Sequence, residues 1–210
     1  MTVTIWLVRH GLKKIAIGDV PLTAAGIEQA KATAEALRGR PITAIVSSPL
    51  RRAKETADCA ARVLQLEAVV DVRLRERANW GDMPGQTFEQ FTAIWDRCTA
   101  EPHYRPPGGG DSAAVAAGRL SAAVSDWALR CPPGHGILFV THGGLITDFL
   151  SLSLSEAEQN ALAPEFAAVQ TALIPECSIT ELLVGPDGLR VGTFADTGHL
   201  RGMRPAPPKS

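Results

Sequence analysis

The chain lacks a net charge, long apolar runs and any recognisable targeting segment. Its 210 residues include 21 Lys and Arg against 22 Asp and Glu, so the formal net charge is -1. A chain without a global charge has no general attraction to nucleic acid or to an anionic membrane. No apolar stretch approaches membrane-span length, and no basic segment followed by an apolar one stands at the N-terminus. We therefore expect a cytoplasmic protein that binds neither nucleic acid nor membranes.

Closely spaced cysteines are also missing. The four cysteines, Cys59, Cys98, Cys131 and Cys177, contain no CxxC pair. This spacing suggests neither a zinc site nor a disulfide framework, and scattered free thiols are the simpler expectation. No carboxylate-rich metal cluster is visible either, so no cofactor or metal ion is expected. The sequence leaves the oligomeric state open, with a homodimer as one alternative.

What the chain does have is an alternation of strand-like and helix-like segments. Short apolar runs predict buried strands at 3–8, 42–46, 69–70 and 137–141. Helical spacing predicts helices at 23–38, 50–64, 88–98, 111–130 and 143–152, with Thr23 and Ser48 as N-caps. Two further runs, 178–184 and 189–194, flank Gly-Pro-Asp-Gly and predict a hairpin.

This alternation predicts the fold class. It is typical of an α/β protein, here a three-layer α/β/α arrangement with a mostly parallel central sheet. The closing hairpin would add antiparallel strands to that sheet. A length of 210 residues suits one domain with a full core. We expect a single domain over residues 1–203 and a mobile tail over residues 204–210.

Three of the predicted strands lead into residues suited to bind an anion. These residues are Arg9-His10-Gly11, then Ser48-Pro49 with Arg51 and Arg52, and then His142-Gly143-Gly144. Ligands of open α/β sheets bind at the carboxyl ends of the strands. Helix N-termini favour anions, and the arginine guanidinium matches phosphate oxygens. Each short motif alone is weak, but together they predict a phosphoryl site.

The ordered set of motifs resembles the histidine phosphatase superfamily, the phosphoglycerate-mutase-like enzymes, over nearly the whole chain. The matching segments are 7–11, 21–26, 47–57, 74–76, 110–112 with Arg119, 140–144 and 196–200. The resemblance implies a phosphoglycerate-mutase-like fold. It also implies a phosphomonoesterase that hydrolyses a small phosphorylated metabolite through a covalent phosphohistidine, without a metal ion.

The resemblance further implies a role for individual residues. His10 would be the nucleophile, and Glu76 would protonate the leaving oxygen and then activate water. The groups that would hold the phosphoryl oxygens are Arg9, Arg52 and His142. Further candidate substrate contacts are Gly143, Lys13 and Arg77. The neighbouring Arg51 is expected to be peripheral.

The chain departs from the family directly after its first motif. The family normally continues with Glu or Gln and then Thr or Ser, whereas Leu12-Lys13-Lys14 stands here. Either Lys13 or Lys14 replaces the missing groups with a point charge, or both lysines face solvent. The segment 73–86, with Asn79 and Trp80, is expected to border the pocket and to contact the leaving group.

Two other functions stay open at this stage. A phosphoglycerate mutase would need a pocket for a carboxylate and a second phosphate, and the shortness of the chain favours hydrolysis instead. A non-catalytic phosphate-binding module on the same fold is the alternative from another class. The altered residues after Gly11 keep that alternative open, and the intact set of predicted catalytic residues argues against it.

Overall fold

The computed structural model describes residues 2–203, and the predicted tail over residues 204–210 lies outside the described residues. The strands are β1 (Val3–Arg9), β2 (Ile42–Ser47), β3 (Ala68–Val70), β4 (Gly136–Thr141), β5 (Ile179–Gly185) and β6 (Gly188–Val191). The helices are α1 (Ala24–Ala36), α2 (Arg51–Leu64), α3 (Phe88–Ala100), α4 (Ala113–Arg130), α5 (Gly143–Ser153), α6 (Glu156–Leu162) and α7 (Phe166–Val169).

The strands form one mixed sheet in the order β3-β2-β4-β1-β5-β6. Neighbouring strands from β3 to β1 pair in parallel. Strand β5 runs antiparallel to β1, and β6 pairs antiparallel with β5 as the predicted hairpin. The predicted fold class is therefore confirmed, including the antiparallel hairpin that the C-terminal part of the chain adds at one edge of the sheet.

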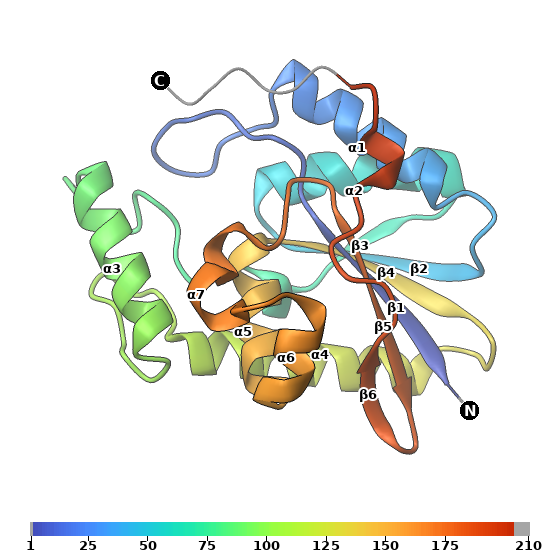
Figure 1. Ribbon diagram of the computed structural model, residues 1–210. Helices are drawn as coiled ribbons and strands as arrows, with labels where there is room; N and C mark the ends of the chain where they lie inside the picture. Colours follow the sequence, from blue (N-terminus) through green and yellow to red (C-terminus); the bar gives the residue numbers. More distant parts are fainter. Residues whose placement is uncertain (1, 204–210) are drawn as a thin grey trace.

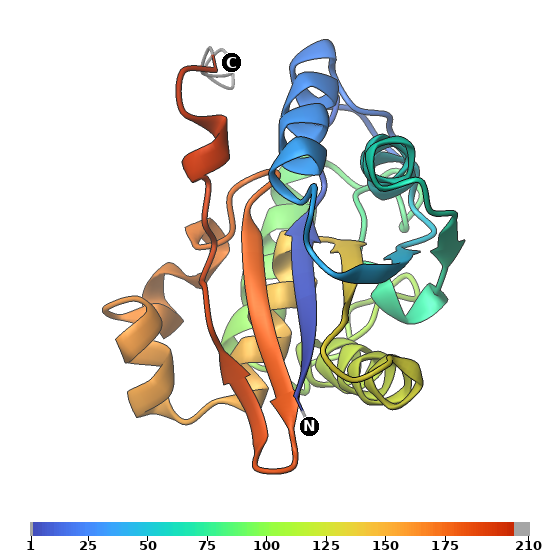
Figure 2. The same ribbon diagram turned by 90° about the vertical axis from the view of Figure 1, so that its right-hand side faces the viewer.

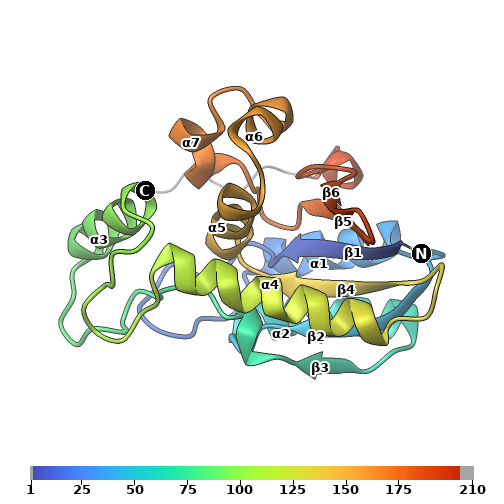
Figure 3. The same ribbon diagram turned by 90° about the horizontal axis from the view of Figure 1, so that it is seen from below.

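Helices cover both faces of the sheet because the central strands are apolar on both sides. Successive residues of a strand point to opposite faces, so Ile5 and Leu7 join one core cluster while Trp6 and Val8 join the other. The first cluster packs against α4 and α5, and the second packs against α1 and α2. Figures 1 and 3 show these layers, and Figure 2 shows α1 and α2 together on one side of the strands.

The strand register brings three strand ends together. Strands β1 and β4 are neighbours with Arg9 opposite Thr141, and the His10 backbone N–H donates to the Thr141 carbonyl at 2.9 Å. Strand β2 lies on the other side of β4, and the Ser48 N–H donates to the Val140 carbonyl at 2.9 Å. Residues that follow these strands therefore meet at one edge of the sheet, as the sequence predicts.

The starts of the first two long helices differ in how well the sequence predicted them. Thr23 caps α1 as expected, with its side chain accepting from the Gly26 N–H. The prediction that Ser48 caps α2 was wrong, because the N-cap is Leu50 and it makes no side-chain cap bond. The Ser48 hydroxyl instead lies 2.7 Å from Nε2 of His142, on the neighbouring strand end.

Helix α3 stands apart from the layers. It begins with a capping box formed by Thr87 and Gln90. Figures 1 and 3 show it beyond the sheet, on the side where β1 and β4 end. Its position is relevant to the candidate site because residues 79–95, in α3 and in the segment before it, lie near the ends of the central strands.

Candidate active site

His10 lies at the centre of the cluster at the strand ends and is buried. Its Nδ1 is 2.8 Å from the Gly11 carbonyl oxygen, which accepts hydrogen bonds only, so Nδ1 carries the proton. The other ring nitrogen, Nε2, accepts a hydrogen bond from Nε of Arg52 at 3.1 Å. The Gly11 N–H in turn donates to the Thr56 hydroxyl at 3.1 Å. The contacts therefore fix the tautomer of His10 and leave the Nε2 lone pair facing Arg52.

His142 lies beside His10, with their ring centroids 5.1 Å apart. The Ser48 hydroxyl accepts from the Leu50 N–H at 3.3 Å and lies 2.7 Å from Nε2 of His142, where the ring tautomer decides which of the two groups donates. In the tautomer in which the Ser48 hydroxyl donates to Nε2, the proton of the neutral His142 ring is on Nδ1. That buried nitrogen has no hydrogen-bond partner within residues 2–203.

Arg9 is held from the C-terminal part of the chain. Its Nη1 donates to the carbonyl of Ile174, and its Nη2 forms an ion pair with Glu176 at 2.6 Å. Its Nε is buried and has no partner among the described residues. A Cβ built on Gly143 would lie 3.3 Å from this Nε, so Arg9 passes close to the N-terminus of α5.

At this edge the buried Nε of Arg9 and Nδ1 of His142 have no hydrogen-bond partner among the described residues, and neither does the buried hydroxyl of Ser178 beside Arg9. Buried donors are almost always satisfied in folded proteins, so an unsatisfied one suggests a missing acceptor. The positive end of the α5 dipole lies at the same place, because Gly143 is its first residue. Together these groups form a site suited to an oxygen-rich anion.

Glu76 is buried and held by two backbone N–H groups. Its Oε1 accepts from the Arg77 N–H at 3.0 Å, and its Oε2 accepts from the Gly144 N–H at 3.1 Å. The second bond ties the carboxyl group to the first turn of α5, next to His142. Glu76 therefore belongs to the same cluster as His10, and Arg52 is close enough to feel its charge.

Arg77 does not join this cluster, which corrects the expectation that it contacts substrate. Its guanidinium is buried, where it pairs with Asp148 at 2.5 Å and donates to the Thr99 hydroxyl at 2.6 Å. The guanidinium carbon also lies 3.8 Å from the centroid of the Trp95 ring. Burial raises the pKa of Asp148 to about 7 against the opposing effect of Arg77. Arg77 therefore joins α3 to α5.

This buried pair predicts a large change in stability. Arg77→Met is expected to lower the free energy of unfolding by about 3–5 kcal/mol, because it leaves the Asp148 carboxylate buried and unpaired. Urea unfolding would measure the loss. The double variant Arg77→Met with Asp148→Leu should recover most of it, since replacing both charges removes the desolvation penalty. Equal stability of the single and double variants would contradict this assignment.

Three further residues that the sequence analysis considered are Lys13, Lys14 and Arg51. Lys13 bridges to Leu22 through the backbone, and its charge helps to lower the pKa of His10. Lys14 is exposed. Arg51 is exposed and pairs with Glu55 at 2.7 Å, so its peripheral position is confirmed. Lys13 thus adds a third positive charge near His10, after those of Arg52 and Arg9, and its contact with a phosphoryl group stays a prediction.

Sequence reasoning missed two residues that organise the site. Ser48 was interpreted only as a helix cap, and Glu176 was not considered. Nothing near Glu176 in the sequence indicates that it pairs with Arg9, which is 167 positions away. The Ser48 interpretation had a usable signal, since the serine stands two residues after the end of a predicted strand.

The two histidines have pKa values well below their ordinary value of 6.5. Burial is the main cause for both rings, and Arg52 adds to it. The unfolded chain therefore binds protons at these positions below about pH 6.5, while the folded protein does not. Stability should fall as the pH drops through that range.

We predict that this effect is measurable at His10. Between pH 7 and pH 5.5 the parent should lose about 1 kcal/mol more unfolding free energy than His10→Asn, which has no ring to protonate. Urea unfolding at the two pH values provides the comparison. Equal losses in both proteins would show that His10 titrates normally in the folded state.

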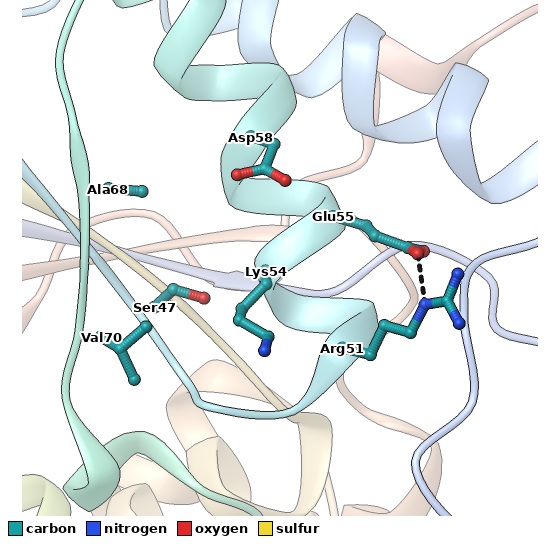
Figure 4. Close-up of a pocket in the computed structure, with 7 residues that line it drawn as sticks. All are labelled: Ser47, Arg51, Lys54, Glu55, Asp58, Ala68 and Val70. Carbon is teal, nitrogen blue, oxygen red and sulfur yellow. Dashed lines mark hydrogen bonds and ion pairs between the residues drawn. The ribbon is translucent and has the colours of Figure 1, made fainter.

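Other surface features lie outside the cluster. A hollow of about 330 Å³ lies between α2 and β3 and is lined by Ser47, Arg51, Lys54, Glu55, Asp58, Ala68 and Val70. Figure 4 shows these side chains. None of the residues predicted to be catalytic lines the hollow.

All four cysteines are free thiols, as expected. No helix within residues 2–203 is long and apolar enough to cross a membrane. The same residues contain no cluster of three or more His, Cys, Asp or Glu able to hold a metal ion.

The sheet order and the position of the cluster define a class of protein. A mixed α/β sheet of this kind, with two histidines at adjacent strand ends, has the phosphoglycerate-mutase-like fold. The model of the histidine phosphatase superfamily (branch 1) matches residues 5–197. The chain therefore belongs to the histidine phosphatase superfamily.

Similar proteins include both phosphatases and mutases. A probable phosphoglycerate mutase GpmB of Yersinia enterocolitica is 34% identical over 161 residues, which are 71% of this chain and 74% of that protein. A mycobacterial glucosyl-3-phosphoglycerate phosphatase has a TM-score of 0.73 and 27% identity, covering 94% of this chain and all of that chain. A Bacillus anthracis phosphoglycerate mutase, at 18% identity and a TM-score of 0.72, shares the fold over 95% of each chain. The family match and the phosphatase neighbour support a phosphatase or another enzyme of phosphoryl transfer.

Proposed function

We propose that the protein is a phosphomonoesterase that hydrolyses a small phosphorylated metabolite through a covalent phosphohistidine on His10. One observation carries the proposal. Nε of Arg9 and Nδ1 of His142 are buried and have no hydrogen-bond partner within residues 2–203, beside a histidine whose Nε2 lone pair faces the same cluster. A phosphoryl group would supply oxygen acceptors for those donors and a phosphorus atom for Nε2 to attack.

In the first step, Nε2 of His10 attacks phosphorus and the bond from phosphorus to the ester oxygen breaks. The Arg52 hydrogen bond to Nε2 gives way, and its guanidinium donates to the phosphoryl oxygens with Nε of Arg9 and Nδ1 of His142. These cations and dipoles offset the charge of the transition state. The Glu76 carboxyl group gives its proton to the leaving oxygen, which departs as an alcohol.

In the second step, the Glu76 carboxylate takes a proton from water as the water attacks the phosphorus of phospho-His10. The bond from phosphorus to Nε2 breaks, and inorganic phosphate leaves. Nδ1 of His10 donates to the Gly11 carbonyl throughout, which keeps the ring oriented between the two steps. His10 is ready for the first step at neutral pH because its lowered pKa keeps the ring neutral.

Release of phosphate from a panel of phosphate monoesters tests the proposal directly. The parent protein should release phosphate at the same rate with and without a chelator, since histidine and arginine supply the positive charge of this route. Loss of the rate with chelator would show that a metal ion takes part. No release from any ester would favour a non-catalytic phosphate-binding module.

Phosphoglycerate mutase activity is the second candidate, because relatives at 34% identity carry that name. The two functions differ in the fate of the phosphohistidine, which a mutase protects from water and returns to its product. Incubation with 3-phosphoglycerate and detection of 2-phosphoglycerate by NMR separates them. Under the proposed function, no 2-phosphoglycerate forms.

A further inference from the structure

Four aromatic side chains form a continuous row beside the candidate active site. Trp80, Phe88, Phe91 and Trp95 follow one another with ring centroids 5.2, 6.4 and 5.9 Å apart. Three of them lie on one stripe of α3, at the i, i+3 and i+7 spacing of a single helix face. Phe88 is 54% exposed, and the other three side chains are partly exposed. We call these four residues the aromatic arc.

One end of the aromatic arc lies at the catalytic cluster, and the other end is next in sequence to a residue that contacts the cluster. At one end, Trp80 follows Asn79, whose side-chain oxygen accepts from Nη1 of Arg52 at 3.3 Å. At the other end, a Cβ built on Gly144 would lie 2.4 Å from the Trp95 ring and 2.9 Å from Oε1 of Glu76. Trp95 is thus a neighbour of the carboxyl group that would protonate the leaving oxygen. The aromatic arc therefore ends beside the carboxyl group of Glu76, and Asn79 links the start of the arc to Arg52.

The segment that carries the aromatic arc has no cationic side chain. Residues 78–96 contain no Lys, Arg or His, but they contain the exposed carboxylates of Asp82, Glu89 and Asp96. The arginines on either side of the segment are already paired, Arg77 with Asp148 and Arg97 with Glu101. A second anionic group on the substrate would find repulsion here rather than a partner.

We propose that the aromatic arc binds the leaving alcohol and selects phosphate monoesters whose alcohol is uncharged and presents an apolar or ring face. The inference rests on the proposed function, because the phosphate must sit at His10 for the alcohol to reach Trp95. Aromatic faces contribute affinity to flat apolar groups through stacking and burial. The same surface disfavours phosphoglycerate, which would bring its carboxylate towards the acidic segment.

Binding to a protein that does not turn over its ligand tests the subsite separately from catalysis. The His10→Ala protein is titrated calorimetrically with inorganic phosphate, phenyl phosphate and 3-phosphoglycerate. Phenyl phosphate should bind about tenfold tighter than inorganic phosphate, the gain expected of one aromatic contact. 3-Phosphoglycerate should bind no tighter than inorganic phosphate.

Variants then locate the gain. Adding Phe91→Ala or Phe88→Ala to His10→Ala should remove most of the preference for phenyl phosphate and leave phosphate binding unchanged. Leu129→Ala, which removes an 86% exposed apolar side chain from α4, is the matched control and should change neither. Far-UV circular dichroism confirms that each variant is folded. Two separate substitutions are used so that a local structural change in one variant does not decide the result.

The outcomes separate the two proposals. The subsite is wrong if phenyl phosphate binds no tighter than phosphate, if both arc variants keep the preference, or if 3-phosphoglycerate binds tightest. Hydrolysis by the parent together with any of these results would leave the proposed function intact. Arc-dependent binding of phenyl phosphate without hydrolysis by the parent would instead refute the proposed function and keep the subsite.

Discussion

His10→Ala is expected to lower kcat for any phosphate ester by roughly 10⁶-fold, the loss typical of removing a covalent nucleophile. The alanine leaves the anion-binding donors of Arg9 and His142 in place, so the ester should still bind. The variant should therefore separate binding from chemistry, with a lost kcat and a measurable Kd. Release of inorganic phosphate over several hours provides the measurement.

The matched control is His135→Ala, which removes an exposed histidine from the turn before β4, at the opposite end of that strand. It should keep the full rate. A His10→Ala protein that is folded and retains the parental rate would contradict the role of His10.

Glu76→Gln is expected to reduce kcat/KM by about 10²–10⁴-fold for alkyl phosphates and much less for aryl phosphates. An alkoxide is a poor leaving group and needs the proton from Glu76, whereas a phenolate with an electron-withdrawing substituent leaves without it. Glutamine keeps the shape of the side chain, and its amide oxygen is still able to accept from the Gly144 N–H. Steady-state kinetics on an alkyl and a nitrophenyl ester compare the two.

Glu67→Gln, at an exposed position between α2 and β3, controls for loss of one carboxylate. An equal loss of kcat/KM on both esters in Glu76→Gln would rule out proton donation as the role of Glu76. It would instead indicate that Glu76 has a structural role, in which its carboxyl group holds the backbone N–H groups of Arg77 and Gly144 in place.

Much of the fold follows from local patterns. The apolar runs before His10 and His142 are buried on both faces, which is why they were recognisable as central strands. The hairpin was predicted because a Gly-Pro-Asp-Gly turn separates its strands. The sequence also placed the two histidines at one edge, since the carboxyl ends of parallel strands coincide. The roles of those histidines remain predictions.

What the sequence did not indicate depends on contacts between distant residues. Ser48 fits a helix cap by local rules, but its hydroxyl meets His142 only because β2 and β4 are neighbours. Arg77 follows Glu76 directly, yet its guanidinium points into the protein because Asp148, 71 positions away, lies there. Glu176 reaches Arg9 across a still longer separation. Local sequence specifies neither the direction of a long side chain nor its partner.

Covalent phosphate on His10 is the central claim, and Glu76→Gln offers the best way to detect it. With a nitrophenyl ester the first step needs no acid, but the second step loses its base, so the phosphoenzyme should accumulate. We expect a burst of nitrophenol that approaches one equivalent of protein. Mass spectrometry of rapidly quenched protein should find acid-labile phosphate on His10. Turnover without a burst, or phosphate on any other residue, would contradict the account.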